Sequence, residues 1–367
     1  MTAQVTLATR SEIAAAAALL RAGGVVAFPT ETVYGLGANV SNPSAVKRIF
    51  EIKGRPFDHP LIVHIADSSR LQYWAEDVPE QAWLLAERFW PGPLTLILPR
   101  SSRVPGNVTG GQDTVGLRVP NHPVALALLE ALGPEGALAA PSANRFGHVS
   151  PTTAAHVCGE LGNSVDMILE GGPCEIGLES TIVGFEADTG EAHTGPKNRK
   201  RNGGNSRAVI LRPGGLPLAA LAEVLNGNIV MAEKLNRPPR VPGALASHYA
   251  PATPLELWPG EYLARRSLDL ETRGLNVGII TWSEQFHAQL KQWEGSDNVM
   301  HVPMPPETES YGRLLYATLR RLDNAHLDCL LVEMPPDKPE WMAIMDRLWR
   351  ASCTTIRKNS RDEAVYG

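Results

Sequence analysis

The chain has 367 residues, of which 43% are hydrophobic and 20% are charged, so it can bury the cores of about two or three domains. Its formal net charge is -5, which gives no global basic field of the kind that many nucleic-acid-binding proteins carry. The four cysteines are widely spaced without a C-x-x-C pair, so neither a disulfide framework nor a structural zinc site is expected. The sequence shows no signal-peptide pattern and no apolar run of roughly 20 residues, and it predicts a cytoplasmic protein without membrane spans.

The first part of the chain mixes short apolar strands with helices. Thr9 and Glu12 are spaced as a capping box, and the helix that they begin is expected to end at Gly23-Gly24. Such mixing is typical of an α/β or α+β layered domain. Further helices are expected near Pro43–Lys53, Glu80–Phe89, Val124–Leu132 and Ala154–Leu161. Strands are expected at Val25–Phe28, at Leu61–Ala66, up to Leu98, at Val115–Pro120, at Ala137–Ala140, and in STIVGF and AVILRPGG.

A polar segment, Glu186–Arg207, separates the last two of these strands. It is rich in Gly and Asn and carries a basic centre of Lys197, Arg199, Lys200 and Arg201. Its composition favours a solvated hairpin insert, and an RNA-contacting loop is the alternative.

The segment Leu235–Leu255 is rich in proline and lacks periodicity, which predicts an extended linker. Beyond it, LNVGIITW and DCLLVEMP are predicted strands, whereas YGRLLYATLRRLDNA and EWMAIMDRLWRAS are predicted helices. This alternation predicts a small second domain with a partly parallel sheet.

Several common functional motifs are missing from the sequence. Gly35 and Gly37 lack the third glycine of the dinucleotide fingerprint, and there is no P-loop, H-E-x-x-H or G-x-S-x-G pattern. His59 and His64 are poorly spaced for shared metal ligation on or near a strand. We therefore expect no protein-bound metal site.

Polar groups that could hold an anion follow a helix and a strand. In KGRP, Lys53 and Arg55 could bind phosphates, although cations at this position more often complement the helix dipole. Ser142 and Asn144 in APSAN, with Ser150 just before a helix, could form an anion site. Helix N-capping is the simpler role of such a hydroxyl.

Arg118 lies inside the apolar strand GLRVP, where an unpaired buried charge would be costly. Its partner is either an acidic residue nearby or the carboxylate of a ligand. Ser180 in LESTIVGF and Arg212 in LRPGG are also polar groups at the boundary of an apolar strand, beside glycine. These groups would converge on one cleft if their strands share a sheet.

Seven motifs, taken together and in order, resemble the YrdC-like threonylcarbamoyl-AMP synthase family. They are FPTETVYGLG, KGRPFDHPLIVHI, FWPGPLTLIL, VGLRVP, APSAN followed by SPT, GLESTIV and LRPGG. The resemblance implies an α/β (α+β) fold of the YrdC-like kind, with a twisted open sheet and helices around a large cavity. PGALASHYAP and the domain after it resemble the longer, two-domain members of the family. This resemblance implies a catalytic domain at 8–218, a linker reaching over the active site at 219–254, and a smaller Rossmann-like α/β domain at 255–367.

The family's reaction converts L-threonine, bicarbonate or CO2, and ATP with Mg²⁺ into L-threonylcarbamoyl-adenylate and pyrophosphate. The resemblance thus implies a nucleotidyltransferase that needs no protein nucleophile, in agreement with the lack of a catalytic triad pattern. It implies a downstream tRNA threonylcarbamoyl transferase complex as the user of the product, for modification of the adenosine next to the anticodon. Weak contact with tRNA or other double-stranded RNA is a further implied interaction, and no membrane partner is implied.

Carried over position by position, the resemblance implies two sets of site residues. The set for L-threonine is Thr32, His64, Arg118 and Ser180. The set for ATP is Lys53, Arg55, His59, Thr114, Ala140, Ser142, Asn144, Ser150, Arg212 and Tyr249. Lys53 and Arg55 are also the implied catalytic residues.

The opening motif and the linker carry further expectations. Gly35 and Gly37 are expected to let the chain turn tightly, Tyr34 to brace the loop, and Glu31 either to contact the ligand or to brace. The segment Pro242–Pro251 is expected to be a lid that keeps water from an unstable carbamate.

Two departures from the family pattern stand out. His59 replaces the usual Asn, so one nucleotide contact could be altered or pH-sensitive. The segment Glu186–Arg207 is longer than the usual turn at that place and could shade the entrance of the cleft.

Three other functions compete with this interpretation. A carbamoyl transferase of the hydrogenase-maturation type would need an acylphosphatase-like region and C-x-x-C zinc fingers, which the sequence lacks. A non-catalytic RNA-binding module is weakly supported by the basic insert and opposed by the net charge. A separate small ligand for the C-terminal domain finds neither a phosphate loop nor a metal set in the sequence.

Overall fold

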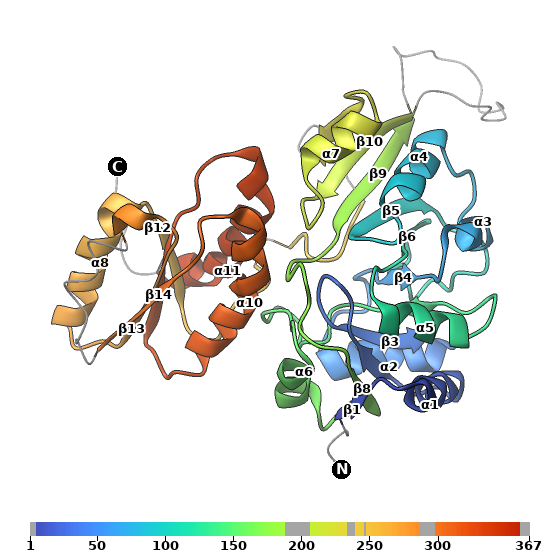
Figure 1. The fold of residues 1–367 in the computed structure, drawn as a ribbon, viewed down its shortest axis with the longest axis horizontal. Coiled ribbons are helices and arrows are strands. Elements are labelled where there is room, and N and C mark those ends of the chain that lie inside the picture. The colour runs from blue at the N-terminus through green and yellow to red at the C-terminus, as the bar shows by residue number, and fades with distance from the viewer. Residues whose placement is uncertain (1–4, 188–205, 233–238, 246, 287–297, 360–367) are drawn as a thin grey trace.

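The computed structural model describes residues 5–187, 206–232, 239–245, 247–286 and 298–359. Figure 1 shows two domains side by side, the first coloured from blue to yellow and the second orange and red. The basic centre of the expected hairpin insert, 197–201, lies outside the described residues, so its two alternative roles stay predictions.

The first domain is built on one mixed sheet. Its strands are β1 (Val5–Leu7), β2 (Val26–Phe28), β3 (Gly35–Asn39), β4 (Ile62–His64), β5 (Leu94–Pro99), β6 (Thr114–Arg118), β7 (Leu138–Ala139), β8 (Met167–Glu170), β9 (Thr181–Ala187), β10 (Ser206–Arg212) and β11 (Ile229–Met231). They follow the order β1-β8-β2-β3-β7-β4-β6-β5-β9-β10-β11. Parallel pairs, such as β4 with β6, stand beside antiparallel pairs, such as β5 with β6. This sheet confirms the predicted α/β fold class.

Helices cover this sheet, and local sequence sets where they begin and end. They are α1 (Arg10–Arg21), α2 (Pro43–Lys53), α3 (Leu71–Trp74), α4 (Glu80–Phe89), α5 (Pro123–Ala131), α6 (Ala154–Leu161) and α7 (Leu218–Val224). Thr9 caps α1, whose Glu12 N–H donates to Thr9 Oγ1. Gly54 ends α2 in the left-handed conformation, at φ 62°. This C-terminus places Lys53 inside the domain.

The glycine pair of the opening motif does not form a tight turn, and this expectation was wrong. Gly35 and Gly37 lie in β3, which runs antiparallel to β2. A Cβ atom on Gly37 would lie 2.8 Å from the Phe28 ring, and one on Gly35 would lie 3.1 Å from it. The glycines are therefore needed because an aromatic ring packs flat against the strand. Tyr34 is fully buried and donates to the Gly172 carbonyl at 2.9 Å, which confirms its bracing role.

The second domain is a four-stranded sheet with helices on it. Its strands are β12 (Leu255–Trp258), β13 (Val277–Thr281), β14 (Val299–Pro303) and β15 (Cys329–Glu333), in the order β12-β15-β13-β14. Its helices are α8 (Gly260–Thr272), α10 (Thr308–Asp323) and α11 (Met342–Asn359). All neighbouring strands are parallel, whereas a partly parallel sheet was expected. Helical crossovers such as α8 and α10 return the chain to the same end of the sheet, and that connection gives parallel pairs.

The segment expected as a linker begins with regular structure. It contains α7, which begins at Leu218, and β11, which pairs in parallel with β10 of the first sheet. The described chain is irregular from residue 239 until β12. This irregular part crosses from one domain to the other.

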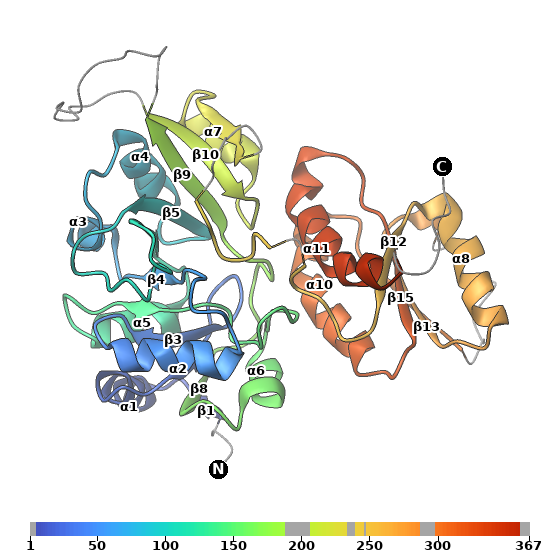
Figure 2. The ribbon, with the colours of Figure 1, turned by 180° about the vertical axis from the view of Figure 1, so that it is seen from behind.

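The two domains share an apolar core. In both views of the ribbon, α10 and α11 face the first domain while α8 lies on the far side (Figures 1 and 2). One buried cluster joins Val149 and Leu178 of the first domain to Tyr316 and Leu348 of the second. Gly177, at φ 77°, allows α10 to approach, because a Cβ there would lie 2.6 Å from the Arg313 Cα. The domains are thus packed together by more than their covalent connection.

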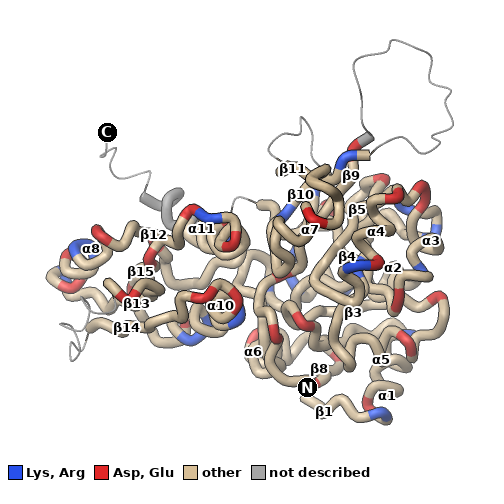
Figure 3. The backbone as a smooth tube through the Cα atoms, turned by 45° about the horizontal axis from the view of Figure 1, so that its top comes forward, with Lys and Arg blue, Asp and Glu red and all other residues tan. Residues whose placement is uncertain are grey.

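Charges are spread over both domains. Figure 3 shows basic and acidic residues interspersed along the helices and loops of the described chain. No helix of the described chain is long and apolar enough to cross a membrane. Cys158, Cys174 and Cys329 are free thiols.

Candidate active site

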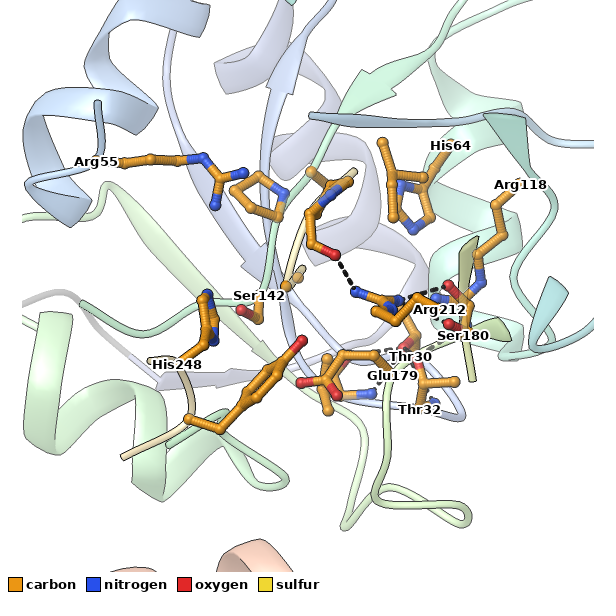
Figure 4. Close-up of a pocket in the computed structure, with 18 residues that line it drawn as sticks. Thr30, Thr32, Arg55, His64, Arg118, Ser142, Glu179, Ser180, Arg212 and His248 are labelled. Atoms are coloured by element: carbon orange, nitrogen blue, oxygen red, sulfur yellow. Dashed lines mark hydrogen bonds between the residues drawn. The ribbon is translucent and has the colours of Figure 1, made fainter. Parts of the chain in front are cut away.

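A cavity of about 50 Å³ lies where strand ends of the first domain meet the irregular linker. Figure 4 shows side chains from separate elements pointing into this one space. Among its lining residues are nine that the resemblance implied: Thr32, Arg55, His64, Arg118, Ala140, Ser142, Ser180, Arg212 and Tyr249. The expected convergence of strand-end polar groups on one cleft is therefore present in the structure.

The ends of β4 and β6 carry one side of the cavity. The two strands are parallel neighbours, and His64 lies directly opposite Arg118. Arg118 is 4% exposed; its Nη2 donates to Thr32 Oγ1 at 2.9 Å and its Nε to the Gly92 carbonyl at 3.3 Å. Its Nη1 has no hydrogen-bond partner among the described residues. The Arg118 guanidinium is thus held in place, while the N–H groups of its Nη1 remain available to a ligand.

Glu31 is the acidic neighbour of Arg118, one of the two partners that the sequence left open. Its Oε1 lies 2.7 Å from Arg118 Nη2. Neither carboxylate oxygen, however, accepts a well-directed hydrogen bond from a described residue. Two opposite charges at this distance attract each other even when the N–H group is poorly aligned with the oxygen. The stronger interaction, a well-aligned hydrogen bond between the charged groups, is not formed here. A ligand carboxylate can therefore still compete for the guanidinium.

His64 is a neutral imidazole in this site. It is 3% exposed, and burial together with the charge of Arg118 lowers its pKa to about 3. Its Nδ1 has no hydrogen-bond partner among the described residues, and its ring packs edge-on against Phe28. It can therefore offer a ligand a hydrogen bond without adding charge.

Ser180 and Arg212 form a second wall. Arg212 Nη2 donates to the Ser180 carbonyl at 2.7 Å, and Ser180 Oγ lies 2.8 Å from Thr95 Oγ1. Arg212 Nη1 donates to the Pro242 carbonyl of the linker at 2.8 Å. Its Nε has no partner among the described residues. Burial lowers the pKa of this arginine from its usual value, but it stays a cation at neutral pH.

Arg55 brings another buried cation to the cavity. It is 6% exposed, its Nη2 donates to the Pro60 carbonyl at 2.8 Å, and it stacks over the Phe146 ring. Burial and the nearby charge of Arg212 lower its pKa to about 10. Two buried positive charges that line one cavity favour an anionic ligand there.

Lys53 shapes the cavity from behind. Its Nζ donates to the carbonyls of Ser142 and Asn144, so it fixes the segment that carries the Ser-x-Asn motif. Burial, followed by the charge of Arg55, lowers its pKa well below the usual value. In this conformation the ammonium group is satisfied by backbone and does not line the cavity.

Four more implied residues stand outside the lining. Thr114 begins β6, at the opposite end of the strand from Arg118. The His59 ring packs edge-on against Phe146, with ring centres 5.2 Å apart. Asn144 and Ser150 are turned inward: Asn144 Nδ2 donates to two neighbouring carbonyls, and Ser150 Oγ donates to the Glu179 carboxylate at 2.6 Å. Their roles toward the nucleotide stay predictions.

The linker supplies one wall of the cavity. Pro242, Gly243, His248 and Tyr249 line it. Tyr249 is 2% exposed, with its ring 4.1 Å from the His248 ring. Gly243 packs so closely that a Cβ there would lie 1.9 Å from the tyrosine oxygen. The chain between the domains is thus folded into the site.

Sequence reasoning missed Glu179, His248 and Thr30, which also line the cavity. Glu179 immediately precedes Ser180 in LESTIV, so a charge stands at the boundary of an apolar strand. The same signal had singled out Arg118. His248 is the neighbour of Tyr249, and Thr30 Oγ1 donates to the Val33 carbonyl at 2.6 Å and shapes the turn that presents Thr32.

The described residues offer no ready metal cage. No group of three or more His, Cys, Asp or Glu that could hold a metal ion occurs among them. Glu179 is the acid that lines the cavity, and its oxygens already accept from Ser150, Tyr316 and Arg347. The carboxylate of this lining acid is therefore already bonded to protein donors.

The chemistry of the cavity points to anions. Three buried guanidinium groups, those of Arg55, Arg118 and Arg212, face it, while the charge of Glu179 is paired with Arg347. Planar guanidinium groups match carboxylates and phosphates in pairs of hydrogen bonds. Both a carboxylate and a phosphate chain therefore suit this site.

Comparison with family models gives two matches along the chain. A model described as "Telomere recombination" matches residues 18–193, and one described as "Threonylcarbamoyl-AMP synthase, C-terminal domain" matches residues 216–353. The boundary between the two matches lies close to the start of α7.

Curated relatives match over nearly the whole length. A threonylcarbamoyl-AMP synthase of Bacillus subtilis is 41% identical over 347 residues, covering 93% of each chain. One of Pyrococcus abyssi is 40% identical over 357 residues, covering 95% of this chain and 96% of its own. Among solved structures, P. abyssi Sua5 complexed with L-threonine has a TM-score of 0.78 and 38% identity over 94% of this chain and 95% of that one.

Proposed function

The chain belongs to the threonylcarbamoyl-AMP synthase family and is a nucleotidyltransferase, and we propose that it makes L-threonylcarbamoyl-AMP and pyrophosphate from L-threonine, bicarbonate or CO2, and ATP bound to Mg²⁺. The observation that carries the proposal is one cavity lined by three buried arginines, Arg55, Arg118 and Arg212. One guanidinium suits an amino-acid carboxylate, and two suit a chain of phosphates.

The threonine half of the proposal rests on four neighbouring side chains. Arg118 binds the carboxylate through the donors that Thr32 and Gly92 leave free. His64 and Ser180 offer hydrogen bonds to the ammonium and hydroxyl groups. The L-threonine complex of the P. abyssi relative supports this assignment of substrate.

The chemistry needs positioning and charge, not a protein nucleophile. The threonine amine forms a bond to the carbon of CO2 and loses a proton, which gives a carbamate. A carbamate oxygen then forms a bond to the α-phosphorus of ATP, and the bond from that phosphorus to the bridging oxygen breaks to release pyrophosphate. Holding the reactants in line and neutralising the charge that builds on the phosphates supply most of the acceleration in reactions of this type.

Arg55 and Arg212 are the cations that we assign to the phosphates. Arg55 Nε and Arg212 Nε are buried and have no partner among the described residues, so each keeps a donor for an oxygen atom. Lys53 acts from behind by holding the carbonyls of Ser142 and Asn144, and it fixes the wall against which the nucleotide lies.

The linker acts as a lid. Pro242, Gly243 and Tyr249 line the cavity, so we assign to the segment 242–251 the role of a cover that opens when the nucleotide enters. A closed site keeps water from the carbamate. A Tyr249→Ala variant should lose turnover and release more free carbamate or hydrolysed product, and a variant with neither change would contradict the lid.

The product is an activated carbamoyl group, a mixed anhydride with AMP. Its natural consumer is a transferase that moves this group to an amine, and we propose that the acceptor is the adenosine next to the anticodon of tRNA. The downstream complex would then be a partner of this chain, through its product.

The test is an assay of the purified chain with ATP, Mg²⁺, bicarbonate and L-threonine. We expect pyrophosphate release together with a nucleotide of the mass of threonylcarbamoyl-AMP. Both should disappear when threonine or bicarbonate is left out. ATP binding without any adenylate product would contradict the proposal and favour a binding module.

A further inference from the structure

Both helices of the second domain that face the first domain reach the same acidic side chain. Glu179 Oε2 accepts from Tyr316 Oη of α10 at 2.9 Å and from Arg347 Nε of α11 at 2.8 Å. Its Oε1 accepts from Ser150 Oγ at 2.6 Å. Glu179 itself lines the cavity beside Ser180 (Figure 4). One carboxylate thus joins the second domain to the wall of the site.

This carboxylate is fully committed to its protein partners. It is 7% exposed, and burial alone would favour its neutral form. The charges of Arg347 and Arg212 and the bond from Ser150 instead hold its pKa at about 2. An ionised group with three directed partners is fixed in orientation, because breaking any contact leaves a buried charge unpaired.

The same helices hold the segments on either side of Glu179. Arg347 Nη2 donates to the Pro213 carbonyl at 3.0 Å, next to Arg212. Arg320 of α10 donates from Nε to the Ser150 carbonyl at 3.3 Å. The second domain therefore touches the backbone of two segments that carry residues implied in ATP binding.

The helix α10 contains an internal comparison. Tyr311 and Tyr316 are both fully buried in the shared core of the interface. The hydroxyl of Tyr316 bonds to Glu179, whereas that of Tyr311 has no hydrogen-bond partner among the described residues. Removing either hydroxyl takes one oxygen atom out of the buried interface. Only the Tyr316 hydroxyl, however, bonds to a residue that lines the cavity.

We propose that Tyr316 and Arg347 of the second domain are positioning residues for the nucleotide half of the active site, acting through Glu179 on Ser150 and on the Arg212 segment. The inference rests on the proposed function. It gives the second domain a part in the reaction: it orients one wall of the cavity rather than only stabilising the fold.

The test compares Tyr316→Phe with Tyr311→Phe in steady-state assays of pyrophosphate release. Tyr316→Phe should raise the KM for ATP by about threefold to tenfold, the effect of losing one hydrogen bond to a charged group, with the KM for threonine changed less than twofold. Tyr311→Phe should leave both values as in the wild type. Thermal unfolding of both variants shows that each is folded.

A double variant tests whether the change in the KM for ATP depends on Ser150. If Tyr316 acts through Glu179 on Ser150, adding Tyr316→Phe to a Ser150→Ala variant should raise the KM for ATP by much less than it does alone. Arg347→Lys keeps a charge near Glu179 but loses the guanidinium that bonds both Glu179 and the Pro213 carbonyl, and it should show the same ATP-specific change.

The outcomes separate the two proposals. A wild-type chain that makes no threonylcarbamoyl-AMP overturns the proposed function. An active wild type in which Tyr316→Phe and Tyr311→Phe have the same KM for ATP overturns the positioning role alone. Fully additive effects of Tyr316→Phe and Ser150→Ala would also overturn it.

Discussion

Two buried arginine–glutamate pairs border the same cavity, and they are built differently. In the first pair, Arg118 with Glu31, the acid is close but accepts no well-directed hydrogen bond. In the second pair, Arg347 with Glu179, the acid accepts three directed bonds. The first pair leaves an arginine able to take another carboxylate. In the second pair, both carboxylate oxygens of Glu179 accept hydrogen bonds, and these bonds connect the wall of the cavity to the second domain.

The two pairs differ in the direction of their hydrogen bonds and not in how deeply they are buried. The side chains of all four residues are at most 9% exposed, so accessibility does not separate the pair that we assign to ligand binding from the pair that we assign to support. The direction of the hydrogen bonds does, because a charge whose partners are poorly aligned stays available to a ligand. The predictions below test this contrast.

The largest effect is expected at the first pair. Arg118→Lys keeps a positive charge beside Glu31, so the fold should hold, but it loses the planar fork. We expect kcat/KM for threonine to fall about a hundredfold, the size of losing a buried charged contact. The control is Arg48→Ala, which removes an exposed pair with Asp166 and should change kcat/KM less than twofold. Equal rates for Arg118→Lys and wild type would contradict the assignment of Arg118.

The second pair should matter most for stability. Arg347→Met leaves the Glu179 charge buried beside one remaining neutral donor on each oxygen, and we expect the free energy of unfolding to fall by about 3 kcal/mol. Arg266→Met is the matched control, since Arg266 of α8 pairs with Glu256 of β12, is 24% exposed and lies away from the interface. Its loss should be about 1 kcal/mol or less.

Urea unfolding measures both losses. Adding Glu179→Gln to Arg347→Met should restore part of the stability, because the uncompensated charge is then gone. No recovery in that double variant would show that the pair does not act as described.

Two neutral histidines of the cavity should contribute to the pH dependence of stability. Burial lowers the pKa values of His64 and His248 to about 3. The unfolded chain takes up protons near pH 6.5, while the folded chain keeps both imidazoles neutral until about pH 3. Their contribution to stability is therefore complete above pH 6.5 and is lost as the pH falls toward 3.

At pH 5 the loss should be about 2 kcal/mol for each histidine. Thermal unfolding across this range measures the slope, and a His248→Gln variant should show a flatter one. An identical slope in the variant would contradict a neutral His248 in the folded chain.

The smallest effect is expected when the two acids are made neutral. Glu31→Gln should cost about 1 kcal/mol, since the buried Arg118 guanidinium keeps its hydrogen bonds to Gly92 and Thr32 and the glutamine oxygen can still face it. Glu179→Gln should cost about 2 kcal/mol, because an amide nitrogen replaces an oxygen that accepts from protein donors. Equal costs in urea unfolding would remove the distinction between the pairs.

Structure could be predicted from the sequence most accurately where it depends on residues close together in the chain. The capping box at Thr9 and the buried strand ends were readable, because they depend on residues close together in the chain. His64 and Arg118 could be expected in one cleft because parallel strands that share a sheet end at the same edge, and the register confirms that they are neighbours.

The rest depends on contacts between distant segments. Glu179 meets Arg347 across 168 residues, and no local signal pairs them. The tight turn expected at Gly35 and Gly37 is instead a strand, and this error is local: the pattern does not show that the Phe28 ring of the preceding strand lies against both glycines. Lys53 was expected to face phosphates, but the direction of its ammonium group depends on carbonyls of residues 142 and 144.

The most direct measurement is a crystal structure of the chain with L-threonine and a non-hydrolysable ATP analogue. We expect the threonine carboxylate on the Arg118 guanidinium, the phosphates between Arg55 and Arg212, and Glu179 still bonded to Tyr316 and Arg347. A carboxylate bound elsewhere, or Glu179 turned into the cavity to hold the ligand, would contradict the division of roles between the two pairs.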